Sequence, residues 1–171
     1  MQKILCFLIF TLSLVSAHTQ LLPRNINGMV EFSEDVPVPG VDRQSLFSRA
    51  KSFIGTAEGT VAKSTFVIDQ EGSSVVLTRT INVREGFATT RSEMSYKIVV
   101  NCLDESYKYK FSDFVFSYQA GTMTALKITP IEEEQGKGVT KKQWEKIKSL
   151  TVHDVEEILT KLKTLMISSC P

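Results

Sequence analysis

Four stretches of alternating apolar and polar residues between positions 60 and 118 constrain the fold more than any other feature of the sequence. β-Branched residues fill stretches 60–68 and 74–83, and residues 69–73 between them carry the Asp, Gly and Ser of a hairpin turn. Residues 94–102 alternate again, and after a short turn at 103–106 residues 107–118 form the fourth stretch. Such alternation is typical of half-buried strands. The sequence therefore predicts an antiparallel meander of four strands.

The fourth of these strands changes phase. Its aromatic residues occupy odd positions up to 111 and even positions from 114 onward: Tyr107, Tyr109, Phe111, Phe114, Phe116 and Tyr118. A β-bulge places one extra residue in a strand and bends it. We therefore expect a bulge near Ser112 and Asp113, which keeps both sets of aromatic side chains on the inner face and curves the sheet.

A strand and a helix are expected before the meander. Residues 28–36 carry Val30, Phe32 and Val36 at alternate positions, and the prolines at 37 and 39 end this strand. Asp42 then offers an N-cap, and apolar residues at helical spacing predict a helix that stops near Gly55.

After the meander, residues 123–129 predict an edge strand that ends at Pro130. Thr140 and Gln143 have the spacing of a capping box at the start of a long amphipathic helix. Its apolar face is formed by Trp144, Ile147, Val155, Ile158, Leu159, Leu162, Leu165 and Met166. Thr151 and Asp154 repeat the cap-like spacing, so this helix is either continuous or kinked or broken near Leu150.

The element order is β-α-β-β-β-β-α, which predicts an α+β fold. One curved antiparallel sheet is expected to expose one face and to be covered on the other by helices, with the long C-terminal helix packed on it. We divide the chain into a signal peptide at 1–17, an N-terminal tail at 18–28, a sheet domain at 29–131, a polar linker at 132–139, and the C-terminal helix of the same domain at 140–168.

The signal peptide sets the expected location. Lys3 precedes an apolar run at 4–15, and Val15, Ser16 and Ala17 supply the small residues of a cleavage site. The run is shorter than the roughly 20 residues of a spanning helix, so we expect no transmembrane segment and a periplasmic or secreted protein. Cleavage removes one of the 20 basic residues and none of the 19 acidic ones, which leaves a formal charge of zero. A neutral exported chain is not expected to bind nucleic acid.

Several short motifs carry a resemblance to a known family. They are residues 28–32 (Gly-Met-Val-Glu-Phe), 36–41 (Val-Pro-Val-Pro-Gly-Val), 46–50 (Leu-Phe-Ser-Arg-Ala) and 111–116 (Phe-Ser-Asp-Phe-Val-Phe). With the signal peptide, they resemble a family of uncharacterised exported bacterial proteins, common in Bacteroidetes, whose fold is like that of the TATA-box-binding protein. The resemblance covers roughly residues 21–118 and implies that fold. It implies no activity, because the family has no agreed catalytic residues.

Few residues in the sequence are candidates for catalysis or metal binding. No nucleophile elbow or Cys-His pattern appears, so we expect no enzyme and no cofactor. If cleavage makes His18 the N-terminal residue, His18 and His153 together could bind copper in a site of the histidine-brace type. The simpler interpretation is that His18 lies in the N-terminal tail and that His153 is a surface residue of the helix. The acidic run 132–134 is a minor calcium candidate, and a solvated loop is the simpler interpretation. Export permits Cys102 and Cys170 to form a disulfide; alternatively, Cys102 is buried and Cys170 is a free thiol.

The remaining candidate site is aromatic. A tentative ligand or partner surface consists of Phe66, Tyr96, Tyr109, Phe111 and Phe116. The alternative is that these side chains are core residues, as aromatic residues in strands often are. We expect a non-catalytic binding or interaction module that acts on a protein of the cell envelope through the open sheet face or beside the C-terminal helix. The alternatives are a carrier with a pocket for a small apolar ligand between sheet and helix, and the copper protein. The oligomeric state does not follow from the sequence.

Overall fold

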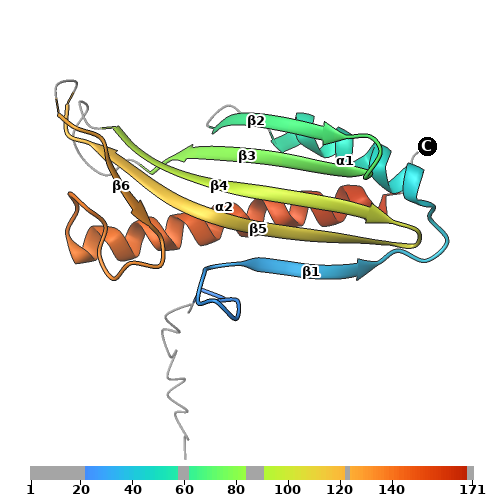
Figure 1. Cartoon of the computed structure of the whole chain (residues 1–171), viewed down its shortest axis with the longest axis horizontal. Coiled ribbons are helices and arrows are strands. Elements are labelled where there is room, and N and C mark those ends of the chain that lie inside the picture. The colour runs from blue at the N-terminus through green and yellow to red at the C-terminus, as the bar shows by residue number, and fades with distance from the viewer. Residues whose placement is uncertain (1–21, 58–61, 84–90, 122–123, 169–171) are drawn as a thin grey trace, which may run out of the picture.

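One antiparallel sheet of six strands forms the fold, and two helices lie on one of its faces (Figure 1). The computed structural model describes residues 22–57, 62–83, 91–121 and 124–168. In chain order the elements are β1 (Phe32–Pro37), α1 (Arg43–Ala57), β2 (Ala62–Asp69), β3 (Ser74–Asn82), β4 (Arg91–Leu103), β5 (Ser106–Gln119), β6 (Lys127–Pro130) and α2 (Lys141–Ile167). The predicted α+β class is confirmed, and the elements follow the predicted order with one addition. The edge strand expected at 123–129 is present as β6, but it spans only Lys127–Pro130.

The strand order in the sheet is β1-β5-β4-β3-β2, and β6 pairs with the far end of β5. Strands β2 to β5 form the expected meander, while β1 joins it beside β5, with Phe32 opposite Phe111. The expected start of β1 at residue 28 was wrong. Gly28 has a positive φ of 76°, and residues 24–30 form a tight loop closed by an isolated bridge between Arg24 and Val30, so the strand begins at Phe32.

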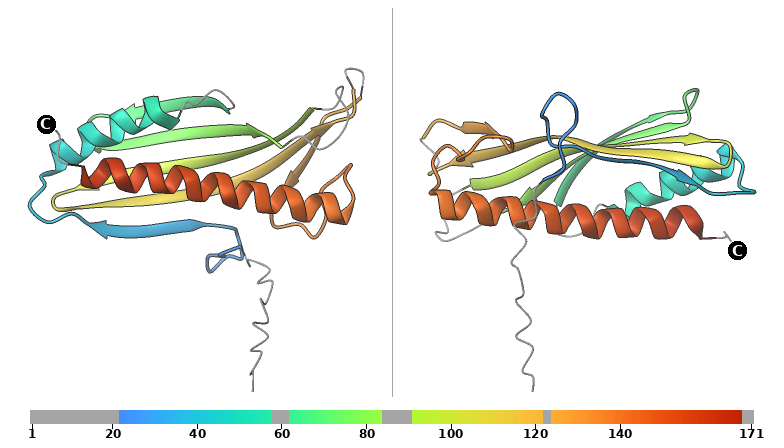
Figure 2. Two further views of the ribbon diagram at one scale, coloured as in Figure 1. Left: turned by 180° about the vertical axis from the view of Figure 1, so that it is seen from behind. Right: turned by 90° about the horizontal axis from the view of Figure 1, so that it is seen from below.

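The molecule has two layers. Figure 2 shows α1 and α2 on the same side of the sheet, while the loop that precedes β1 lies on the opposite side. Within the described residues no helix covers that second face, which we call the open face. The core therefore lies between the sheet and the two helices, as the single apolar stripe of each helix predicts.

The expected β-bulge in β5 is confirmed. Ser95 of β4 lies opposite Val115, but Lys97 lies opposite Ser112, so Asp113 and Phe114 together face the single residue Tyr96. Asp113 has a φ of 59°, a left-handed conformation that Asp adopts more readily than most residues. As a result Phe111 and Phe114 both point into the core although their positions differ in parity.

The C-terminal helix α2 is continuous from Lys141 to Ile167. The predicted capping box is confirmed: the Thr140 hydroxyl accepts from the backbone N–H of Gln143, whose side chain in turn accepts from the backbone N–H of Thr140. The alternative of a break near Leu150 is wrong. The Thr151 hydroxyl donates to the carbonyl of Ile147 at 2.8 Å, so it hydrogen-bonds within the helix instead of capping a new one.

A buried ion pair fixes α2 to the middle of the sheet. Arg79 of β3 donates from Nε and Nη2 to the two carboxylate oxygens of Asp154, at 3.0 and 2.8 Å. The Tyr96 hydroxyl of β4 donates to the same carboxylate. Burial and the neighbouring Asp154 raise the pKa of Tyr96, so its phenol keeps the proton that it donates. We call Arg79, Tyr96 and Asp154 the clasp.

Substitution of Asp113 tests the bulge. Asp113→Val places a β-branched residue at a positive φ and is expected to lower the free energy of unfolding by about 1–2 kcal/mol. Asp113→Gly keeps that conformation without steric cost and is the matched control. Urea unfolding followed by circular dichroism measures both variants. Equal stability of the Val and Gly variants would contradict the left-handed conformation.

Removal of one partner tests the clasp. Asp154→Ala leaves the Arg79 guanidinium buried without its carboxylate, which is expected to lower the free energy of unfolding by about 3–5 kcal/mol. The double variant Arg79→Met with Asp154→Leu removes both charges and is expected to recover most of this loss. Equilibrium unfolding in urea gives both values. A double variant no more stable than the single one would show that the buried charge is not the cause.

Candidate functional site

The open face carries polar and small apolar side chains in cross-strand rows. Directly opposite residues of an antiparallel pair share a face, so the register assigns each row. One row consists of Val67, Val76, Val99 and Lys110, and the next consists of Thr65, Thr78, Lys97 and Ser112. Each row thus combines uncharged side chains on β2 and β3 with a lysine nearer the centre of the sheet. The face is neither uniformly charged nor uniformly apolar.

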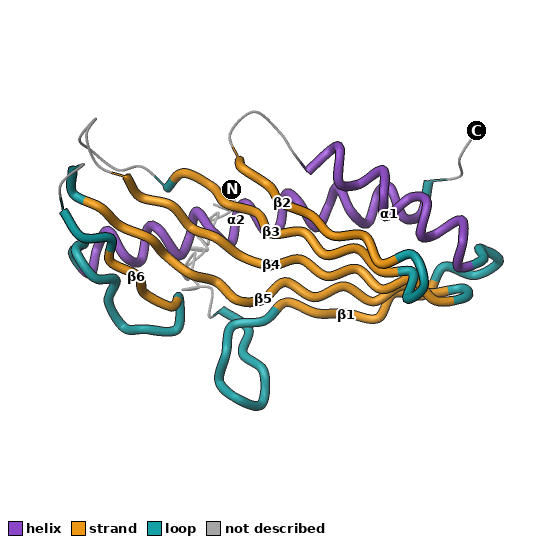
Figure 3. Tube along the Cα trace, turned by 45° about the horizontal axis from the view of Figure 1, so that its top comes forward, coloured by secondary structure: helices purple, strands orange, loops and turns teal. Residues whose placement is uncertain are grey.

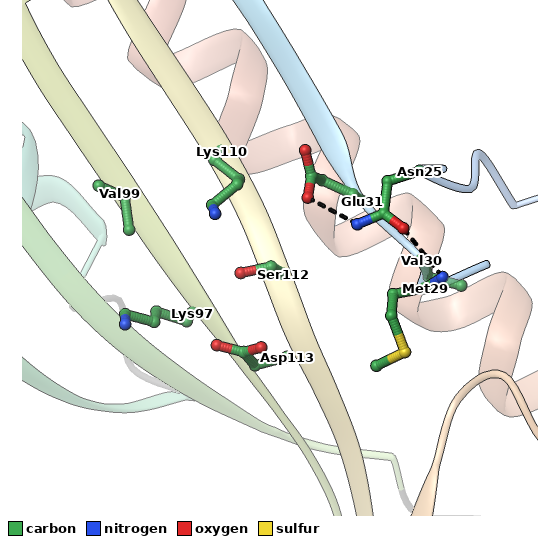
Figure 4. A pocket seen from close by; sticks show the side chains of 9 residues that line it. All are labelled: Asn25, Met29, Val30, Glu31, Lys97, Val99, Lys110, Ser112 and Asp113. Carbon is green, nitrogen blue, oxygen red and sulfur yellow. Dashed lines mark hydrogen bonds between the residues drawn. The ribbon is translucent and has the colours of Figure 1, made fainter. Parts of the chain in front are cut away.

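A pocket of about 210 Å³ lies on this face at the end of both rows. It is lined by Asn25, Met29, Val30 and Glu31 from the chain that leads into β1, by Lys97 and Val99 of β4, and by Lys110, Ser112 and Asp113 of β5. Figure 4 shows Lys97 and Lys110 on neighbouring strands, with Asn25 and Met29 on the other side of the pocket. The bulge takes part in the site, because it carries Asp113.

The loop that forms one wall of the pocket is held by its own side chains. Asn25 donates from Nδ2 to Glu31 at 3.1 Å, and its Oδ1 accepts from the backbone N–H groups of Asn27 and Met29 at 3.0 and 3.1 Å. A carboxylate oxygen of Glu132 accepts from the backbone N–H of Val30 at 2.7 Å. The wall is therefore fixed from two sides before any ligand binds, which lowers the entropy cost of binding.

The charges around the pocket are balanced. Lys97 and Lys110 carry positive charge, while Glu31 and Asp113 carry negative charge. The hydrogen bond from Asn25, with further contributions from Ser33 and the nearby lysines, holds the pKa of Glu31 below its usual range, so this carboxylate stays ionised. The pocket offers ammonium donors, carboxylate acceptors and the Ser112 hydroxyl. This chemistry suits recognition of a charged or hydrogen-bonding group.

Four of the five residues of the predicted aromatic surface are buried. Of its five residues, Phe66 is half exposed at the edge of the sheet, whereas Tyr96, Tyr109, Phe111 and Phe116 are at most 4% exposed. They pack against one another and against the helices: the ring centroids of Tyr96 and Phe114 are 5.2 Å apart, and those of Phe116 and Trp144 are 5.3 Å apart. The alternative interpretation as core residues describes these four side chains.

Tyr109 also connects β1 to α2. Its hydroxyl donates to Glu34 of β1 at 2.7 Å, and Lys163 of α2 donates to the same carboxylate at 2.6 Å. These two hydrogen bonds hold the pKa of Glu34 below its usual range. The neighbouring Tyr107 hydroxyl is buried and has no hydrogen-bond partner among the described residues. Burial, with a smaller contribution from Glu34, raises the pKa of Tyr107 to about 12.

The other candidate residues do not assemble into a site in the described part of the chain. Cys102 is buried, and burial raises the pKa of its thiol to about 11. Cys170, His18 and the segment 1–17 expected to be a signal peptide lie outside the described residues, and His153 is exposed on α2. Among the described residues, no three His, Cys, Asp or Glu side chains are placed to hold a metal ion. No helix in the described part is long and apolar enough to span a bilayer.

The acidic run has a structural role. Glu132 binds the N-terminal loop, and the carbonyl of Glu133 accepts from Trp144 Nε1 at 2.9 Å. The loop that follows packs closely on the same ring, since a Cβ at Gly136 would lie 2.6 Å from a ring carbon of Trp144. The segment expected to be a polar linker is thus part of the packed structure.

The pocket residues were not singled out from the sequence. The sequence contained one usable signal, which is that each lysine lies between two apolar residues of an alternating strand. Lys97 lies between Tyr96 and Ile98, and Lys110 lies between Tyr109 and Phe111. That signal assigns both lysines to the open face. It does not show that a loop from the N-terminal end closes over them, because the loop and the strands are far apart in sequence.

Comparison with known proteins gives a family and a fold. A family model described as a domain of unknown function (DUF4468) with TBP-like fold matches residues 32–117. A search of curated proteins finds no significant match.

Two solved structures are similar to this chain. The crystal structure of a TBP-like protein from Parabacteroides distasonis has a TM-score of 0.60 at 16% identity and covers 83% of this chain and 97% of that chain. The crystal structure of a DUF4468 family protein from Bacteroides ovatus has a TM-score of 0.61 at 12% identity and covers 90% of this chain and 93% of that chain. At such identities the likeness shows the fold alone. Since the family model spans half of the sequence, the chain belongs to the DUF4468 family, a domain of unknown function with a TBP-like fold.

Proposed function

We propose that this protein is a non-catalytic binding module that uses the open face of its sheet to hold another protein of the cell envelope. The observation that carries the proposal is the pocket beside Lys97 and Lys110, which lies on the sheet face that no helix covers in the described residues. Sites that combine apolar contact with a few placed polar groups are typical of recognition surfaces. The leader at residues 1–17 supports an envelope location.

The chemistry of the face indicates what the partner presents. A carboxylate of the partner fits between the ammonium groups of Lys97 and Lys110, where it forms charge-assisted hydrogen bonds. Short apolar side chains of the partner fit the valine row formed by Val67, Val76 and Val99. Hydroxyl groups of the neighbouring row, such as those of Thr78 and Ser112, supply hydrogen bonds to its backbone.

The packing between sheet and helices favours this proposal over a carrier for a small apolar ligand. The Tyr96 ring stacks on Phe111 and Phe114 at centroid distances of 6.1 and 5.2 Å, and Tyr96 also binds Asp154 of α2. Entry of a ligand there would separate these rings and open the clasp. Binding on the open face requires no such change.

Photo-crosslinking in the cell tests the proposal. A photoreactive amino acid at Thr78, which is exposed on the open face, is expected to capture a defined protein. Charge reversal through Lys97→Glu with Lys110→Glu is expected to abolish the capture, because the partner's carboxylate is then repelled. Mass spectrometry of the crosslinked band identifies the partner.

The matched control carries the same photoreactive group at His153, which is exposed on α2 on the other side of the sheet. Thermal unfolding of the charge-reversal variant checks that its fold is intact. Equal capture from His153, or capture from Thr78 that persists after charge reversal, would count against the open face as the binding surface.

A further inference from the structure

The two edges of the main sheet differ in a way that concerns association. The edge strand β1 carries Glu34 and Asp35 near its centre and ends at Pro37, and charges and proline on an edge hinder pairing with another strand. The opposite edge strand β2 has an uncharged centre, residues 64–68 (Ser-Thr-Phe-Val-Ile), and contains no proline. Among the described strands, it pairs with β3 on one side and has no neighbour on the other. An unguarded edge of this kind is a template for a further strand.

This edge also exposes apolar side chains on both of its faces. Phe66 lies opposite Leu77 on the helix side and is 50% exposed, and Val67 lies opposite Val76 on the open face and is 67% exposed. In β3, β4 and β5 the large apolar side chains of the helix side are buried, except for Tyr118 at the end of β5, which is partly buried. One added strand beside β2 would cover Phe66 and Val67 at the same time.

We propose that a second copy of this chain pairs with β2, so that two sheets join into one continuous antiparallel sheet. The charges of β2 argue for a second copy over an unrelated strand. Lys63 is the third residue before Phe66, and Asp69 is the third residue after it. By backbone position, an antiparallel pair centred on Phe66 therefore sets residue 63, a lysine, opposite residue 69, an aspartate, of the other chain. Asp69 Oδ1 also accepts from the backbone N–H of Gly72 in its own turn at 3.0 Å.

The same register satisfies the rest of the strand. Phe66 stands opposite its own copy on the two-fold axis, Thr65 stands opposite Val67, and Ser64 stands opposite Ile68. Aromatic pairs and opposite charges that face each other across strands each contribute about 0.2–1 kcal/mol. A shift of the register separates the Lys from the Asp and moves the two Phe side chains apart. The strand is thus self-complementary in one register.

The positions of the helices are compatible with this arrangement. A two-fold axis perpendicular to the sheet leaves the helices of both copies on the same side and joins the two open faces. Figures 1 and 3 show α1 behind the half of β2 that leads to Asp69. Because the paired strands are antiparallel, the two α1 helices then lie at opposite ends of the seam.

Disulfide trapping tests the register directly. The full-length chain is purified as the cell processes it, with Cys170→Ser in every variant, while the native Cys102 is buried. Phe66→Cys is expected to form a covalent dimer on mild oxidation, because directly opposite Cβ atoms lie about 4.5–5.5 Å apart. Thr65→Cys is the matched control, since residue 65 stands opposite residue 67 and two copies of residue 65 are too far apart to bridge.

Sedimentation equilibrium across a concentration series tests the association itself. The wild-type chain is expected to dimerise, and Lys63→Glu is expected to lower the association constant about tenfold, because like charges then face each other at both ends of the pair. A monomer at every concentration would overturn the proposal, as would a monomer with an unrelated chain bound at β2. A dimer whose association constant is unchanged by Lys63→Glu would show another interface and would also overturn the proposal. So would a disulfide-linked dimer that forms as readily through Thr65→Cys as through Phe66→Cys.

Discussion

The extra residue in β5 is the constraint on which the rest of the structure depends. β5 is the only described strand that pairs with three others, β1, β4 and β6, and it supplies much of the aromatic core. Without the bulge at Asp113, a change of parity would turn Phe114 and Phe116 toward solvent. Trp144 would then lose the ring on which it packs, and the first turns of α2 would lose their position on the sheet.

The helix side and the open side of the sheet have different roles. Two ion pairs link the sheet to α2: the clasp fixes the middle of α2, and Glu34 with Lys163 ties β1 to the last turns of α2. The open face instead carries a pocket, because the loop that precedes β1 lies beside Lys97 and Lys110 without filling the space between the loop and these two lysines. The same bulge contributes Phe114 to one side and Asp113 to the other.

Local sequence patterns predicted the fold, whereas they did not predict the features that depend on contacts between segments distant in sequence. Alternation gave the meander, the parity change gave the bulge, and Thr140 with Gln143 gave the start of α2, because each signal spans a few residues. The pocket joins Asn25 to Lys97 and Lys110, so no local pattern contains it. Arg79 could have indicated the clasp from the sequence. It lies on the same face of β3 as the buried residues Val75, Leu77 and Ile81, and a charged side chain on a buried face requires a buried partner.

The pairing of β1 with β5 determines the order in which the sheet can form. Phe32 pairs with Phe111, so β1, the first of the described strands to be synthesised, has no neighbouring strand until β5 has been made. Strands β2 to β5 pair with their sequence neighbours, whose loops close quickly, whereas β1 must close a long loop. Although β1 is synthesised before the other strands of the sheet, it is therefore the last of β1 to β5 to pair. A chain that ends before residue 106 contains β1 but lacks β5, the strand with which β1 pairs.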